Sequence, residues 1–76
     1  MDRTGQLLQH LAEAEQHITL GERHISSQEM RIADLDLCGY DSTLARSILQ
    51  TFLLVQSQHV THRDHILREL GAASIK

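Results

Sequence analysis

The chain has 76 residues, a formal net charge of −3 with histidine neutral, six histidines and one cysteine, Cys38. A domain of this length hides only about 60% of the surface that its unfolded chain exposes, so small domains usually depend on disulfides, a metal or a partner chain. The single cysteine excludes a disulfide within the chain, and the scattered Lys and Arg residues argue against a nucleic-acid partner.

The first half of the chain carries a seven-residue repeat that predicts one long helix over residues 4–37. From Gln9 the chain reads QHLAEAE, QHITLGE, RHISSQE and MRIADLD. Alternating spacings of four and three place the apolar residues on one stripe, and a strict period of seven predicts a left-handed supercoil with a partner helix. Row a of this stripe contains Leu11, Ile18, Ile25 and Ile32, and row d contains Leu7, Ala14, Gly21, Gln28 and Leu35.

A turn is predicted at residues 38–41. Gly39 can adopt the left-handed conformation that ends a helix, and Asp41 can cap the next helix by accepting hydrogen bonds from its first backbone N–H groups. Asp34 and Asp36 oppose this interpretation, because the helix dipole disfavours acids near a helix C-terminus. We place the turn here because no other glycine is followed two residues later by a capping residue.

Residues 42–70 are expected to form a second helix with more apolar surface than the first helix can cover. Its inward stripe is predicted to contain Ala45, Ile48, Phe52, Val55, His59, His62 and Ile66, beside a second strip of Leu49, Leu53, Val60 and Leu67. Together these strips cover about half of the helix, whereas contact with one neighbour needs about 100°. Leaving such side chains in water costs about 1.5–3 kcal/mol each.

We therefore expect one all-α domain over residues 1–76, an antiparallel two-helix hairpin that dimerises into a four-helix bundle. The core and dimer contacts are expected to come from Leu11, Ile18, Ile25, Ile32, Ile48, Leu49, Phe52, Leu53, Val55, Val60, Ile66 and Leu67.

The six histidines are the unusual chemical feature of the composition. On the first helix, flanking row g contains His10, His17, His24 and Arg31, and flanking row e contains Glu15, Glu22, Glu29 and Asp36. Charges in these rows choose the partner and its orientation in coiled coils, and we interpret the first three histidines in this way. As an alternative, the assembly could respond to acid, because protonating every histidine changes the formal charge to −3 + 6 = +3.

A metal site is a sharper hypothesis. A hairpin folded about the predicted turn would place His62 beside His17 and His59 beside Gly21. Three imidazoles and a water suit zinc or another transition metal, so His17, His59 and His62 form a candidate site. In the alternative interpretation, a neutral His59 fills the space that Gly21 leaves. The chain contains no Glu-x-x-His, Cys-x-x-Cys-His or His-Glu-x-x-His motif.

Motifs for catalysis and for a membrane are both missing from the sequence. His24 is followed by Ile25 and Ser26 rather than by the acid and arginine of phosphoaccepting helical hairpins, and the chain has no proline. Cys38 has no activating base in its sequence context. The longest apolar run, residues 52–55, is too short to span a membrane, and the N-terminus has no signal-peptide segment. We therefore expect a cytoplasmic protein that is not an enzyme.

Four stretches of the chain resemble a group of short bacterial proteins of unassigned function. They are Ala12–Ile18, Gly21–Ile25, Gly39–Arg46 and His59–Asp64. The resemblance covers most of the chain and implies a helical hairpin, with no activity, ligand or partner attached. The expected function is a non-enzymatic interaction module without a cofactor, a homodimer whose outer face or open end binds another protein. The alternative is a small histidine-based bundle for a metal or cofactor.

Overall fold

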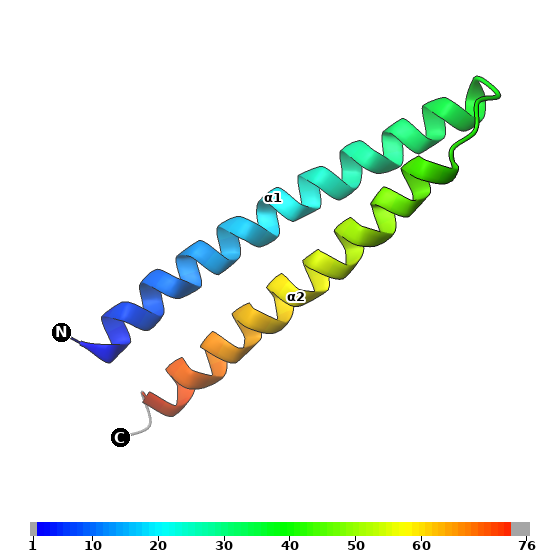
Figure 1. Cartoon of the computed structure of the whole chain (residues 1–76). Coiled ribbons are helices and arrows are strands. Elements are labelled where there is room, and N and C mark those ends of the chain that lie inside the picture. The colour runs from blue at the N-terminus through cyan, green and yellow to red at the C-terminus, as the bar shows by residue number, and fades with distance from the viewer. Residues whose placement is uncertain (1, 74–76) are drawn as a thin grey trace.

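The computed structural model describes residues 2–73 and shows two helices packed side by side (Figure 1). Helix α1 spans Arg3–Leu37 and helix α2 spans Thr43–Ala73, and the described residues contain no strand. The predicted all-α hairpin is confirmed, whereas its dimerisation stays a prediction. α1 begins one residue before its expected range, and α2 begins one residue later and ends three residues later than expected. Residue 1 and residues 74–76 of the expected domain lie outside the described part.

The hairpin is a thin rod with an unusually large surface. Its principal extents are 60 × 15 × 14 Å, and its radius of gyration is 17.4 Å, against about 11 Å for a compact domain of this length. The solvent-accessible surface is 5832 Å², whereas a compact monomer of this size exposes roughly 4700 Å². None of the large side chains in the described residues is fully buried. Within the same residues, neither helix has a stretch long and apolar enough to cross a membrane.

The seven-residue repeat sets the face that α1 turns toward α2. Every member of rows a and d is buried or half-buried in the hairpin. The buried members of α1 are Leu7, Ala14, Ile18, Gln28 and Ile32. Because side chains at alternating spacings of four and three share one helix face, these two rows meet α2 along the whole rod.

Helix α2 has the same seven-residue period as α1, but some of its inward residues differ from those that the sequence predicts. Its two inward rows are Ser42, Leu49, Gln56, Arg63 and Leu70, and Ala45, Phe52, His59, Ile66 and Ala73, all of them buried or half-buried. Of the predicted inward stripe, Ile48, Val55 and His62 are exposed. The prediction was wrong at these positions because it followed apolar residues only. Gln56 and Arg63 are polar, yet they occupy inward positions.

The connection between the helices runs back along α1 before α2 begins (Figure 1). Gly39 has a φ of 76°, and the backbone N–H of Tyr40 donates to the carbonyl of Leu35 at 2.9 Å, which closes the end of α1. The side-chain amide of Gln28 donates to the carbonyl of Ala45 at 2.9 Å. Ala45, the third residue of α2, therefore lies beside a residue nine positions before the end of α1.

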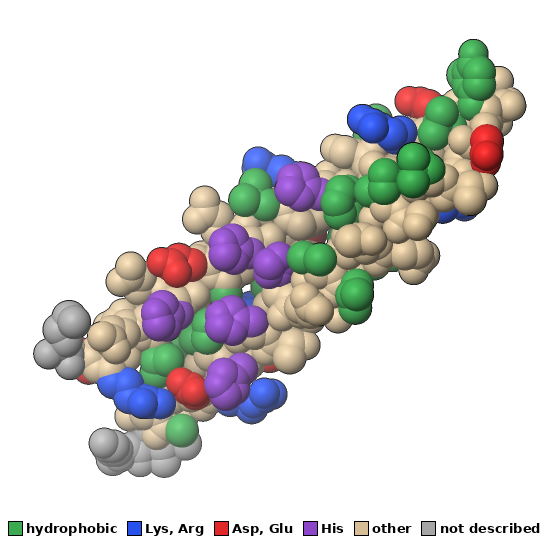
Figure 2. Space-filling model, viewed as in Figure 1, with side chains coloured by type: hydrophobic (Ala, Val, Ile, Leu, Met, Phe, Trp, Pro, Cys, Tyr) green, Lys and Arg blue, Asp and Glu red, His purple; other side chains and the backbone are tan. Residues whose placement is uncertain are grey.

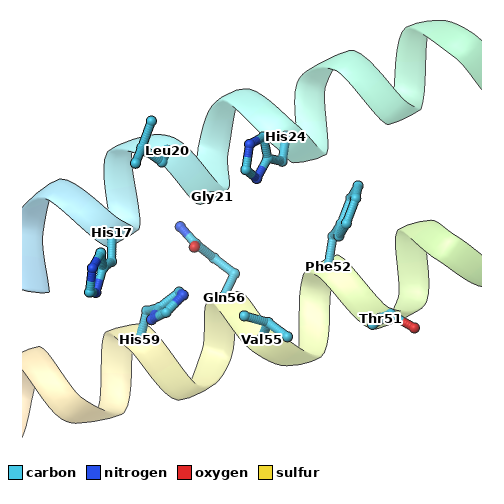
Figure 3. Close-up of a pocket in the computed structure, with 9 residues that line it drawn as sticks. All are labelled: His17, Leu20, Gly21, His24, Thr51, Phe52, Val55, Gln56 and His59. Carbon is cyan, nitrogen blue, oxygen red and sulfur yellow. The ribbon is translucent and has the colours of Figure 1, made fainter.

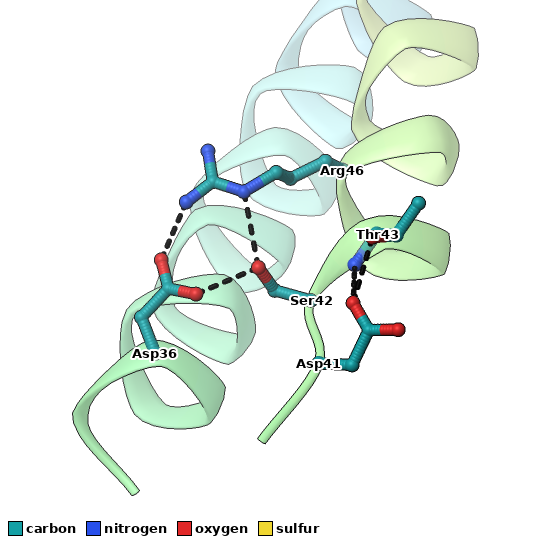
Figure 4. Close-up of polar contacts among 5 residues, drawn as sticks. All are labelled: Asp36, Asp41, Ser42, Thr43 and Arg46. Atoms are coloured by element: carbon teal, nitrogen blue, oxygen red, sulfur yellow. Dashed lines mark hydrogen bonds and ion pairs between the residues drawn. The ribbon is translucent and has the colours of Figure 1, made fainter. Parts of the chain in front are cut away.

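Two aspartates hold this connection (Figure 4). The carboxylate of Asp36 accepts hydrogen bonds from the Ser42 hydroxyl at 2.6 Å and from the guanidinium of Arg46, which also donates to the Ser42 hydroxyl at 3.0 Å. Asp41 caps α2 by accepting from the backbone N–H and the hydroxyl of Thr43, at 3.0 and 2.7 Å. These partners explain why an acid is tolerated at the C-terminal end of α1.

The same bonds lower the pKa of both carboxyls. The hydrogen bond from the Ser42 hydroxyl is the main cause of the lowered pKa of Asp36, and the charge of Arg46 lowers this pKa further. The hydroxyl and then the N–H of Thr43 lower the pKa of Asp41. A carboxyl with a lowered pKa in the folded protein stabilises the fold at a pH above its unfolded pKa. That contribution is lost as the pH falls through the folded pKa.

We expect the thermal midpoint of the protein to fall as the pH drops below about 4, and this dependence on pH to be weaker in the variant that combines Asp36→Asn with Asp41→Asn. Thermal unfolding followed by circular dichroism from about pH 6 to about pH 2.5 measures both slopes. Asp34→Asn, which removes a carboxylate outside this network, is the control and should keep the original slope. Equal slopes in the double variant and the original protein would contradict the assignment.

Candidate functional site

The histidines gather on one face of the rod, over the half of the hairpin that lies away from the turn (Figure 2). We call this the histidine face and define it by the two g rows that border it. On α1 the row is His10, His17, His24 and Arg31, and on α2 it is Ile48, Val55, His62 and Glu69. The opposite side is bordered by the e rows, and there Asp36 of α1 bonds to Arg46 of α2. The two sides of the rod thus differ in chemistry.

A groove opens on the histidine face between the helices (Figure 3). Its volume is about 400 Å³. It is lined by His17, Leu20, Gly21, His24, Thr51, Phe52, Val55, Gln56 and His59. Among the described residues, no Asp, Glu, Lys or Arg lines it, so three imidazoles are its ionisable groups.

Gln56 closes the floor of the groove against Gly21. Its side chain extends from α2 toward α1, and its amide Nε2 donates to the backbone carbonyl of Ile18 at 2.9 Å (Figure 3). A Cβ at residue 21 would overlap Oε1 of Gln56 and stand 2.8 Å from its Cδ. Gly21 is therefore needed for this close approach. Oε1 of Gln56 is buried and has no hydrogen-bond partner within the described residues.

The imidazoles occupy the two ends of the groove. The rings of His17 and His59 come from opposite helices, and their centroids lie 5.3 Å apart at a tilt of 45°. At the other end, the ring of His24 lies 5.8 Å from the ring of Phe52. His59 is half-buried, whereas His17 and His24 are exposed. Three imidazoles and one phenyl ring thus frame an apolar centre.

The register of the helices differs from the predicted one by about one helical turn. His17 meets His59 rather than His62, and Gly21 meets Gln56 rather than His59. The cause is the connecting segment that runs back along α1, which places the first turns of α2 deeper along α1 than a tight bend would. The neutral His59 of the alternative interpretation therefore does not fill the space at Gly21.

The residues of the candidate metal site come together only in part. His17 and His59 are neighbours, and His62 lies exposed on the same face. Within residues 2–73, no group of three or more His, Cys, Asp or Glu residues is placed to hold a metal ion. Outside the groove, the imidazole of His65 lies 2.8 Å from the carboxylate of Glu69, which also pairs with Arg3.

Two glutamines to which the sequence analysis assigned no role, Gln28 and Gln56, connect the helices. Each amide donates across the interface to a backbone carbonyl, Gln28 to Ala45 and Gln56 to Ile18. Such a bond is worth about 1 kcal/mol and costs more when one partner is removed from a buried site. The sequence does contain a signal for this role, namely a glutamine in a row of core positions. Which residue the glutamine bonds to, however, depends on the register of the two helices.

No protein-family model matches the chain, and neither curated proteins nor solved structures give a significant match.

We expect Gly21→Ala to destabilise the protein or leave its stability unchanged, although alanine is favoured over glycine in a helix by about 1 kcal/mol. The new Cβ displaces the amide of Gln56 and breaks its bond to Ile18. In a Gln56→Ala background the same change should stabilise by about 1 kcal/mol. Urea unfolding of the four proteins in this cycle measures the coupling. The same effect of Gly21→Ala in both backgrounds would show that the two residues do not interact.

Proposed function

We propose that this chain is a non-enzymatic interaction module that acts as a homodimer of hairpins. The observation that carries the proposal is an apolar row on α2 that the hairpin itself leaves uncovered. Leu53 is 42% exposed, Leu67 is 46% exposed, and Val60 between them is half-buried. The large surface of the rod supports the same conclusion, because a partner chain is one way in which a small domain covers such surface.

Arg46 lies on the side of the rod opposite the histidine face. The row Leu53, Val60 and Leu67 follows Arg46 at seven-residue intervals along α2 and therefore lies on the same side. It is apolar at three successive positions. The corresponding row on the histidine face changes from Ile48 and Val55 to a histidine and a glutamate. Burying those ionisable groups in a dimer would require partners for them. The apolar row is therefore the better surface for a second copy.

The spacing of this row is symmetric about Val60, which suits a twofold dimer. In a twofold contact the same patch meets itself. With the two α2 helices antiparallel and Val60 on the axis, Leu53 would pack against Leu67 of the second copy. The acids of α1, Glu15, Glu22 and Glu29, would lie at the border of this contact, where water and salt screen their charges.

We expect Leu53→Glu combined with Leu67→Glu to weaken self-association at least tenfold, because the change buries charges in the contact. The matched control is Leu54→Glu, whose side chain is 61% exposed and points away from the row, and which should leave the dimer intact. Sedimentation velocity measures the association, and circular dichroism checks that each variant stays helical. A double variant that dimerises like the original protein would exclude this row as the interface.

A cysteine crosslink tests the position of the twofold axis. In a Cys38→Ser background, Val60→Cys should form a disulfide-linked dimer under mild oxidation, since two Cα atoms near an axis can approach within about 7 Å. Val55→Cys, on the histidine face, is the control and should crosslink far more slowly. Faster crosslinking through residue 55 than through residue 60 would assign the dimer to the histidine face instead.

A further inference from the structure

We propose that the groove on the histidine face binds a small aromatic carboxylate, with the anionic group at the pair His17 and His59 and the aromatic body toward Phe52. This inference is independent of the proposed dimer, which covers the other side of the rod. It rests on the size of the groove, its apolar walls and the kind of ionisable groups that line it.

The groove has the dimensions and the walls of a small-molecule site. Its volume of about 400 Å³ falls within the range of known ligand pockets, which is about 300–1,000 Å³. Leu20 and Val55 border it from opposite helices and are about two-fifths exposed, at 41% and 40%. Gly21 contributes no side chain, so the amide of Gln56 packs against it and forms the floor of the groove. An apolar, flat molecule would cover these side chains and remove them from water.

The hydrogen-bonding groups of the lining favour an anion as the occupant. The groove contains imidazoles from both helices and, among the described residues, no carboxylate or fixed cation in its lining. The rings of His17 and His59 lie 5.3 Å apart, so a carboxylate beside both would accept a hydrogen bond from an N–H of each ring. His24, beside Phe52, adds a third donor at the opposite end.

The charged groups around the groove are mixed in sign. The other titratable or charged groups on this face of the two helices are Arg3, His10, Glu13, Arg31 and Asp34 of α1 and His62, His65 and Glu69 of α2. Glu69 is already paired with Arg3 and His65. Since the described residues offer no group of three metal ligands, an organic anion fits the groove better than a metal ion.

The test uses the full chain and 2-naphthoate as the probe, followed by calorimetric titration and by amide NMR. We expect one probe per chain and amide shifts centred on the residues of the groove. The uncharged 2-naphthalenemethanol should bind at least tenfold more weakly.

Variants separate the groove from the face as a whole. His17→Gln combined with His59→Gln should weaken 2-naphthoate binding at least tenfold, whereas His10→Gln combined with His65→Gln should change it less than twofold. Circular dichroism establishes that both pairs fold. The Leu53→Glu and Leu67→Glu variant should bind the probe normally, so failure of the dimer proposal would not affect this result. Equal binding of the uncharged probe, or unchanged binding after loss of His17 and His59, would overturn the proposal.

Discussion

Each helix of this hairpin has one neighbour along its whole length, and this constraint governs the rest of the structure. A helix packed against a single partner can bury only one stripe, and side chains in that stripe keep one side open to water. This is why the described residues include no fully buried large side chain and why the rod exposes 5832 Å². Apolar residues outside the stripe, on both flanks of α2, remain available for contacts with other molecules.

The register of the two helices gives the exposed surface its chemistry. The connection runs back along α1 and is held by Asp36, Ser42 and Arg46, and the amides of Gln28 and Gln56 bridge the helices further along. This register brings His17 to His59 and opens the groove beside Gly21. The opposite side of the rod receives the apolar row of α2. One side thus presents imidazoles and a hollow, and the other presents aliphatic side chains.

Much of the fold could be predicted from local patterns, because those patterns act over short distances. The seven-residue repeat indicated α1 and both of its inward rows. The left-handed Gly39 and the capping Asp41 lie in the connection between the helices, as predicted. The inward face of α2 was less predictable, because Gln56 and Arg63 occupy core positions where apolar residues were expected.

The candidate site could be predicted only in its composition. The sequence showed that histidines accumulate, but their pairing depends on how far the connecting residues run back along α1. No local signal encodes that distance. The predicted register was wrong by one helical turn, so His62 was expected beside His17, where the structure has His59. The hydrogen bond of Gln56 to Ile18, which shapes the groove, depends on the same distance.

The central claim is that this rod carries more apolar surface than it can cover alone. The most direct measurement is thermal unfolding of the unmodified chain over a wide range of concentration, with the mass determined by sedimentation equilibrium in the same samples. Association makes the unfolding midpoint depend on concentration, so we expect the mass of two chains and a midpoint that falls on dilution. The mass of one chain, with a midpoint independent of concentration, would contradict the claim.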